Sequence, residues 1–330
     1  MRADRETIGK FFILLRAGLT DTPAGGFAAT TEEWDAILRL AREQTVPGIV
    51  YSGISRLPES GMPDAARRIA LMVEAERIAA RTRLVGRVAK DLLSELRAAG
   101  LHPVILKGPA AGRHYPAPEL RTSGDIDLFL NRYEYADALS FLSARGIMAF
   151  REPDGSHLYK RDGVTVELHP RYFDLHVREE LLPAVPSPEA ELLMLSAHIL
   201  KHAIGVGVGL RQICDIAQAY RALDGQYDRS ALGGYLRKAG MARWNDLLCS
   251  FLTAYLQVPE QLLPEFRRVS PERLYEIVFA GGNFGRHRKG AKRGKLQTLK
   301  AFAQRLPFSL RLAPRETLRT LAELTQGNLH

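Results

Sequence analysis

The segment 104–130 contains the feature that most limits how this chain can fold. Two aspartates, Asp125 and Asp127, alternate with apolar residues at the start of an apolar run. This alternation predicts a β-strand, because successive side chains on a strand point to opposite faces. Ile126 and Leu128 then face a core, and both carboxylates face the other way. Two carboxylates held this close repel each other unless a cation lies between them, so the pattern predicts a cation site.

A second pair of strands supplies a third acid. The segments 157–161 and 164–169 are joined by Asp162-Gly163, which is a strong hairpin signal. Glu167 and His169 share one face of the second strand, and if that strand pairs with the aspartate strand, Glu167 becomes the third carboxylate of the site. Three such acids suit divalent ions that hold a triphosphate and activate a hydroxyl for phosphoryl or nucleotidyl transfer. Glu167 is then either a metal ligand or a general base, and His169 either touches substrate or metal or orients a carboxylate.

The rest of the chain has mainly helical periodicity, and this predicts an α+β fold with a mixed sheet. The expected regions are an N-terminal helical region at 1–100, a core at 101–185, and a C-terminal helical domain at 186–330 with a basic loop at 281–295. Helices are expected at 5–17, 31–45, 47–54, 64–99, 109–114, 133–144, 187–203, 210–222, 228–239, 242–256, 296–306 and 314–324, and strands at 104–107, 125–130, 147–150, 157–161 and 164–169.

The motifs together resemble a known family. The pattern LKG…YP…LR…DIDL, followed by VELH, is similar to that of the bacterial uncharacterised nucleotidyltransferases, within the superfamily that shares the DNA polymerase β-type fold. The resemblance runs over most of the chain, although its specific motifs lie in 104–169. It implies a nucleotidyltransferase-type mixed β-sheet core with helices, flanked by N-terminal and C-terminal helical regions. It also implies that Asp125, Asp127 and Glu167 are catalytic metal ligands, with Mg²⁺ as the cofactor and Mn²⁺ as an alternative.

The turn before the aspartate strand departs from the superfamily pattern. Members commonly have Gly-Ser at this turn, whereas this chain has Gly108-Pro109 and so lacks the serine hydroxyl that contacts a phosphate. The nucleotide-binding residues expected instead are Lys107, Gly108, Arg121 and His169. Either Lys107 or the backbone N–H groups of the turn would have to replace the serine contact, and the guanidinium of Arg121 suits a triphosphate.

The composition permits an anionic partner but does not identify it. The chain of 330 residues carries a net charge of +9, and seven basic side chains gather within 286–295. That cluster is expected either to be solvated or to bind an anionic acceptor such as RNA or a phospholipid surface. The two cysteines offer no disulfide framework, and no apolar run has the length of a membrane span, so a cytoplasmic location is expected. His198 and His202 stand four apart on a helix, where a packed core or cleft position is favoured over a metal site.

These observations predict a Mg²⁺-dependent enzyme that moves a nucleoside monophosphate from an NTP, with ATP among the candidates, to an unidentified acceptor and releases pyrophosphate. Two alternatives stay open. One is an RNA-directed enzyme of the same superfamily that modifies tRNA or acts as a toxin. The other is a protein of this fold that binds a nucleotide or a nucleic acid without turnover.

Overall fold

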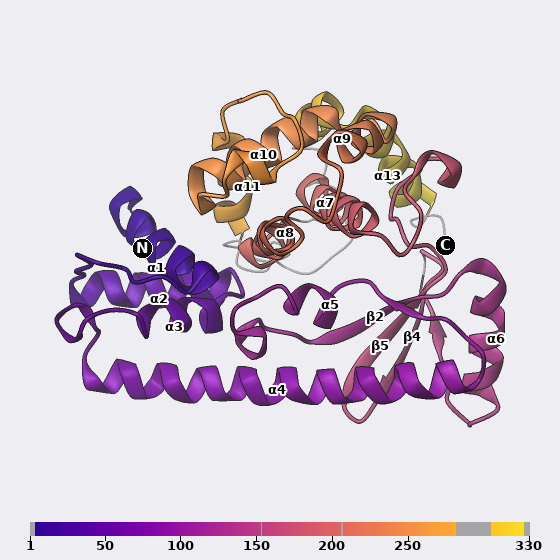
Figure 1. Ribbon diagram of the computed structural model, residues 1–330, viewed down its shortest axis with the longest axis horizontal. Helices are drawn as coiled ribbons and strands as arrows, with labels where there is room; N and C mark the ends of the chain where they lie inside the picture. Colours follow the sequence, from indigo (N-terminus) through magenta and orange to yellow (C-terminus); the bar gives the residue numbers. More distant parts are fainter. Residues whose placement is uncertain (1–3, 153, 206, 282–304, 327–330) are drawn as a thin grey trace. The chain divides into compact units, whose positions relative to one another are not determined.

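The computed structural model describes residues 4–152, 154–205, 207–281 and 305–326 (Figure 1). The chain divides into two compact units. The sheet unit comprises Ile13–Trp34 and Pro47–Tyr172, and the helical unit comprises Met1–Phe12, Asp35–Val46 and Phe173–His330. The division into three regions that the sequence predicts stays a prediction.

One mixed sheet of five strands organises the sheet unit. Its order is β1-β2-β5-β4-β3, and β2 and β5 run parallel while every other neighbouring pair is antiparallel. The strands are β1 (Val104–Ile105), β2 (Asp125–Phe129), β3 (Phe150–Arg151), β4 (His157–Arg161) and β5 (Val164–His169). The hairpin expected between β4 and β5 is present, and both of its turn residues, Asp162 and Gly163, have positive φ angles. The α+β fold class with a mixed sheet is therefore confirmed.

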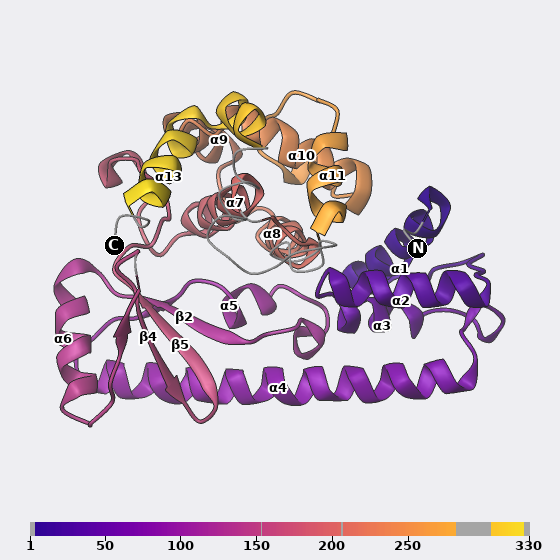
Figure 2. The same cartoon turned by 180° about the vertical axis from the view of Figure 1, so that it is seen from behind.

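Two helices cover the apolar face of this sheet. The long helix α4 (Ala65–Ala98) and the helix α6 (Arg132–Ser143) pack against alternate residues of the central strands (Figure 2). Ile126 and Leu128 of β2 and Val166 of β5 are completely buried in this core. Because side chains alternate on a strand, the residues between them are turned to the opposite face, which is the face of the predicted site.

Two residues in the sequence explain where α4 begins and where it ends. The side chain of Asp64 caps the first turn by accepting a hydrogen bond from the backbone N–H of Arg67. Gly100 follows the last turn with a φ of 80°, a conformation that glycine adopts without steric cost. The 34 residues between these signals form one uninterrupted helix.

Three expectations about individual elements were wrong. The first strand ends at Ile105, and the strand expected at 147–150 is Phe150–Arg151, because Ile147 packs onto the helix-covered core instead of pairing with β4. Helix α11 (Glu272–Gly281) occupies a stretch where no element was expected. Besides α4, the α-helices that precede β2 in the chain are α1 (Arg5–Thr20), α2 (Thr31–Glu43), α3 (Pro47–Ile54) and α5 (Pro109–Gly112).

The helical unit buries its own core and is held by a few buried polar groups. The side-chain amide of Gln44 donates to the carbonyl of Val278 and accepts from the N–H of Leu210, which joins α11 to the start of α8. Its remaining helices include α7 (Pro188–Ile204), α8 (Leu210–Ala222), α9 (Arg229–Lys238), α10 (Ala242–Leu256), residues 305–312 and α13 (Pro314–Gln326). The basic cluster 286–295 and most of the helix expected at 296–306 lie outside the described residues. No helix within the described ranges is long and apolar enough to cross a membrane.

Candidate active site

The pairing of β2 with β5 brings the predicted acids together. The two strands are parallel, and Asp127 is the register partner of Glu167, just as Phe129 is the partner of His169. Asp127, Glu167 and His169 therefore lie on neighbouring strands and on the face opposite the helix-covered core. Asp125 lies two residues before Asp127, where β2 begins, and its side chain is exposed.

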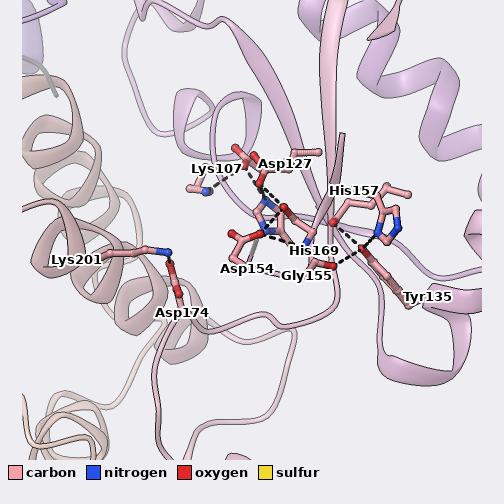
Figure 3. Close-up of polar contacts among 12 residues, drawn as sticks. Lys107, Asp127, Tyr135, Asp154, Gly155, His157, His169, Asp174 and Lys201 are labelled. Atoms are coloured by element: carbon pink, nitrogen blue, oxygen red, sulfur yellow. Dashed lines mark hydrogen bonds and ion pairs between the residues drawn. The ribbon is translucent and has the colours of Figure 1, made fainter. Parts of the chain in front are cut away.

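Asp127 is the centre of the site. It is only 5% exposed, and both partners shown in Figure 3 reach the same atom. Nε2 of His169 lies 2.9 Å from Oδ1 of Asp127, and Nζ of Lys107 lies 3.0 Å from it. Burial by itself raises the pKa of this carboxyl, but the charge of Lys107 and the hydrogen bond from His169 outweigh it, so the pKa of Asp127 is lowered. Asp127 is thus held as a carboxylate.

Lys107 reaches Asp127 because of the backbone that precedes it. The N–H of Leu106 donates to the carbonyl of Asp127 at 3.0 Å, which places the next side chain beside the carboxylate. Burial alone lowers the pKa of Lys107, but attraction to Asp127, and more weakly to Glu167 and Asp125, outweighs it and raises the pKa. The ammonium of Lys107 therefore supplies the positive charge that the acids require.

Gly108 lets the turn approach the start of β2. Its φ is 57°, and a Cβ at this position would lie 3.1 Å from the carbonyl oxygen of Asp125. A side chain would thus be strained by its backbone and crowded by the strand. Pro109 then begins the short helix α5, where its lack of an N–H costs nothing.

Glu167 is oriented by a serine that the sequence reasoning missed. Ser156 is 1% exposed, and its Oγ lies 2.8 Å from Oε1 of Glu167 and 2.7 Å from Oδ1 of Asp154. A hydroxyl carries one proton, so it satisfies one of the two carboxylates at a time. The only signal in the sequence is the polar run Asp154-Gly155-Ser156 directly before a strand that pairs with β5.

Tyr135 anchors the backbone next to that serine. Its hydroxyl lies 3.1 Å from the carbonyl oxygens of Gly155 and Leu168 and 2.8 Å from Nδ1 of His157 (Figure 3). Burial, with a further contribution from the charge of Asp154, raises the pKa of Tyr135 to about 12. The phenol therefore stays protonated and can donate to this segment at neutral pH.

Arg121 is placed differently from the other predicted phosphate ligands. It is 4% exposed, and Nη1 donates to the carbonyl of Thr122 at 3.1 Å. Its own carbonyl accepts from the hydroxyl of Thr82 on α4 at 3.2 Å. Arg121 thus supports the loop that leads into β2, and its contact with a triphosphate stays a prediction.

The donor set fits a divalent cation. Asp127, Glu167 and His169 each offer one ligand atom, and these atoms all lie within 4.8 Å of one another. Across the described residues this is the one group of three or more such side chains. His198 and His202 on α7 instead contact each other edge to face, with ring centroids 4.5 Å apart. The triad offers oxygen and nitrogen ligands, and the exposed Asp125 on the same strand as Asp127 adds a third carboxylate.

A comparison of the sequence with family models agrees with this geometry. The model for an uncharacterised nucleotidyltransferase family matches residues 30–257, which include the whole sheet and its site. The chain belongs to this family of nucleotidyltransferases. No curated protein and no solved structure matches the chain. The family resemblance predicted from the sequence motifs is therefore confirmed.

Proposed function

We propose that the chain is a metal-dependent nucleotidyltransferase that transfers a nucleoside monophosphate from an NTP to an acceptor hydroxyl or phosphate. In this reaction an acceptor oxygen bonds to the α-phosphorus, and the bond from the α-phosphorus to the oxygen bridging it to the β-phosphate breaks. Pyrophosphate leaves, and a hydroxyl acceptor releases its proton to solvent. The observation that carries the proposal is the parallel register of Asp127 with Glu167, with His169 at the same face. Membership of the family supports nucleotidyl transfer in general.

The acids of the sheet have distinct roles in this proposal. Asp127, Glu167 and His169 would hold one divalent ion, and the exposed Asp125 would hold a second that arrives with the NTP. Such ions supply charge stabilisation to the triphosphate and the leaving pyrophosphate. Ser156 holds the carboxylate of Glu167 in place through its hydrogen bond of 2.8 Å.

Lys107 would change partners when the site fills. Its ammonium pairs with Oδ1 of Asp127 at 3.0 Å, which is the atom that a cation would also use. A cation on Asp127 would repel the ammonium and neutralise the carboxylate charge that attracts it. Lys107 is then free to meet the triphosphate, which accounts for a phosphate role without the serine that the turn lacks.

The test is a transfer assay. The protein is incubated with each α-labelled NTP, Mg²⁺ or Mn²⁺, and fractions of a cell extract, and the labelled product is identified. Asp127→Asn should lower transfer by about 10³-fold or more, because it removes a charge that the transition state requires. Asp91→Asn is the matched control, since Asp91 is exposed on α4. Equal transfer by wild type and Asp127→Asn, or no transfer to any fraction, contradicts the proposal.

A further inference from the structure

The ligand types at the site carry information about which ion it holds. Two of the three candidate ligands are carboxylates, but the third is the imidazole of His169. Mg²⁺ is a hard ion that binds oxygen and rarely accepts nitrogen. Imidazole suits first-row transition ions, and Mn²⁺ is one member of that series that also accepts carboxylate and phosphate oxygens.

The distances place His169 among the ligands. In an octahedral site with ligands at about 2.1 Å, neighbouring ligand atoms lie about 3 Å apart. Nε2 of His169 lies 2.9 Å from Oδ1 of Asp127 and 3.7 Å from Oε1 of Glu167. A cation that binds both carboxylates at these atoms therefore also has Nε2 within reach.

The burial of the three side chains also disfavours Mg²⁺. Their exposed fractions are 7% for Asp127, 16% for His169 and 25% for Glu167. Mg²⁺ dehydrates reluctantly and usually keeps several waters, which a recessed site with three side-chain ligands disfavours. Ser156 adds a further constraint, because its hydroxyl hydrogen-bonds Oε1 of Glu167.

We propose that the Asp127–Glu167–His169 site selects Mn²⁺ over Mg²⁺ and that His169 is the ligand responsible for the selection. The meaning of this selection for catalysis rests on the proposed function, whereas the binding itself does not. Mg²⁺ remains suited to the exposed, all-oxygen position at Asp125, where it would enter with the NTP.

The experiment measures metal binding to the full chain without nucleotide. Free Mn²⁺ is followed by its EPR signal in a titration, and Mg²⁺ is then added as a competitor. The wild type should bind Mn²⁺ about 100-fold more tightly than Mg²⁺. His169→Asp turns the site into an all-oxygen set and should reduce this ratio by about tenfold or more. His102→Gln is the control, because His102 is an exposed histidine that pairs with Glu134, and it should leave the ratio unchanged.

A second measurement is made first on the wild type. Pulsed EPR on Mn²⁺ bound to the wild type should show the hyperfine coupling of a directly coordinated imidazole nitrogen, and this coupling should disappear in His169→Asp where that variant folds. A Mn²⁺ to Mg²⁺ affinity ratio within about threefold, or bound Mn²⁺ without nitrogen coupling, overturns the inference. Nitrogen-coordinated Mn²⁺ in a protein that transfers no nucleotide would instead leave the inference standing and refute the proposed function.

Discussion

The sheet site and an arginine-lined hollow in the helical unit are both rich in charge, but they differ in how that charge is held. The hollow has a volume of about 850 Å³ and is lined by Arg243, Arg267, Arg273 and Arg311 with the single acid Asp246. The acids of the two regions are both buried, with side chains 11% exposed for Asp246 and 7% for Asp127, but the side chain of Arg267 is 81% exposed whereas that of Lys107 is 21% exposed. Water can therefore solvate Arg267 without its partner, but it reaches Lys107 in the sheet much less.

This difference predicts a graded response to substitution. In the sheet each charged or hydrogen-bonding group depends on a specific partner placed by strand register. In the hollow the side chain of Arg267 is exposed to water, so its ion pair contributes little to the free energy of unfolding. Four substitutions, ordered from the largest expected effect to the smallest, test how far the comparison holds.

Lys107→Met should have the largest effect on the metal-free protein. It leaves the buried carboxylate of Asp127 without its ammonium, which should lower the free energy of unfolding by about 3 kcal/mol near neutral pH. The same variant should bind Mn²⁺ more tightly, because no ammonium competes for Oδ1, yet transfer less nucleotide. Urea denaturation with EDTA measures the first effect, and EPR titration measures the second. Lys90→Met, at an exposed position of α4, is the control.

The pH dependence of this pair follows from the two pKa directions. The pKa of Asp127 is lowered, so its contribution to stability is present above the ordinary carboxyl pKa and is lost as the pH falls through the lowered value. The pKa of Lys107 is raised, so its contribution is present below the ordinary lysine pKa and is lost as the pH rises through the raised value. The difference between wild type and Lys107→Met should thus be widest near neutral pH and should narrow in strong acid. A difference that stays constant across this range contradicts the pairing.

The sequence predicts those parts of the site that a local pattern records. The alternation from Asp125 to Leu128 predicts which face of β2 each side chain occupies, and the Asp162-Gly163 turn predicts the hairpin of β4 and β5. Once this hairpin pairs with β2, β5 becomes the parallel neighbour of β2. The contact between Ser156 and Glu167 depends instead on how a loop enters β4, which no periodicity encodes. The burial of Arg121 against the loop to β2 is likewise a tertiary effect. A residue whose role depends on packing between distant segments cannot be predicted from local sequence patterns, because no such pattern records the contact.

Ser156→Ala should have the next largest effect. The carboxylate of Glu167 loses a hydrogen bond at a buried position, which should weaken Mn²⁺ binding by about tenfold and lower the free energy of unfolding by about 1.5 kcal/mol. Asp154→Asn is the informative partner variant, because it weakens the competing acceptor and leaves the serine proton for Glu167. It should keep Mn²⁺ affinity within about threefold of wild type. Equal losses in both variants would mean that the Asp154–Ser156 pair, and not the serine hydroxyl alone, orients the Glu167 carboxylate.

Tyr135→Phe should have a smaller effect that is confined to stability. The hydroxyl has one proton for the carbonyl oxygens of Gly155 and Leu168 and also contacts Nδ1 of His157, so its loss should lower the free energy of unfolding by about 1 kcal/mol. Because the pKa of Tyr135 is raised to about 12, the phenol stays protonated and the effect should not vary between neutral and mildly alkaline pH. Chemical denaturation at two such pH values measures it. A loss of Mn²⁺ affinity as large as that of Ser156→Ala would show that the tyrosine acts on the site itself.

Arg267→Ala in the hollow should have the smallest effect, although Arg267, like Lys107, forms an ion pair with a buried aspartate. Its guanidinium lies 3.1 Å from Oδ2 of Asp246, and its backbone N–H donates to Oδ1 at 2.9 Å. The substitution removes the first contact and keeps the second, so Asp246 retains a partner. Because the arginine side chain is largely exposed, the free energy of unfolding should change by about 0.5 kcal/mol or less. A loss approaching that of Lys107→Met in urea denaturation would show that the exposed fraction of a side chain is not what separates the two regions.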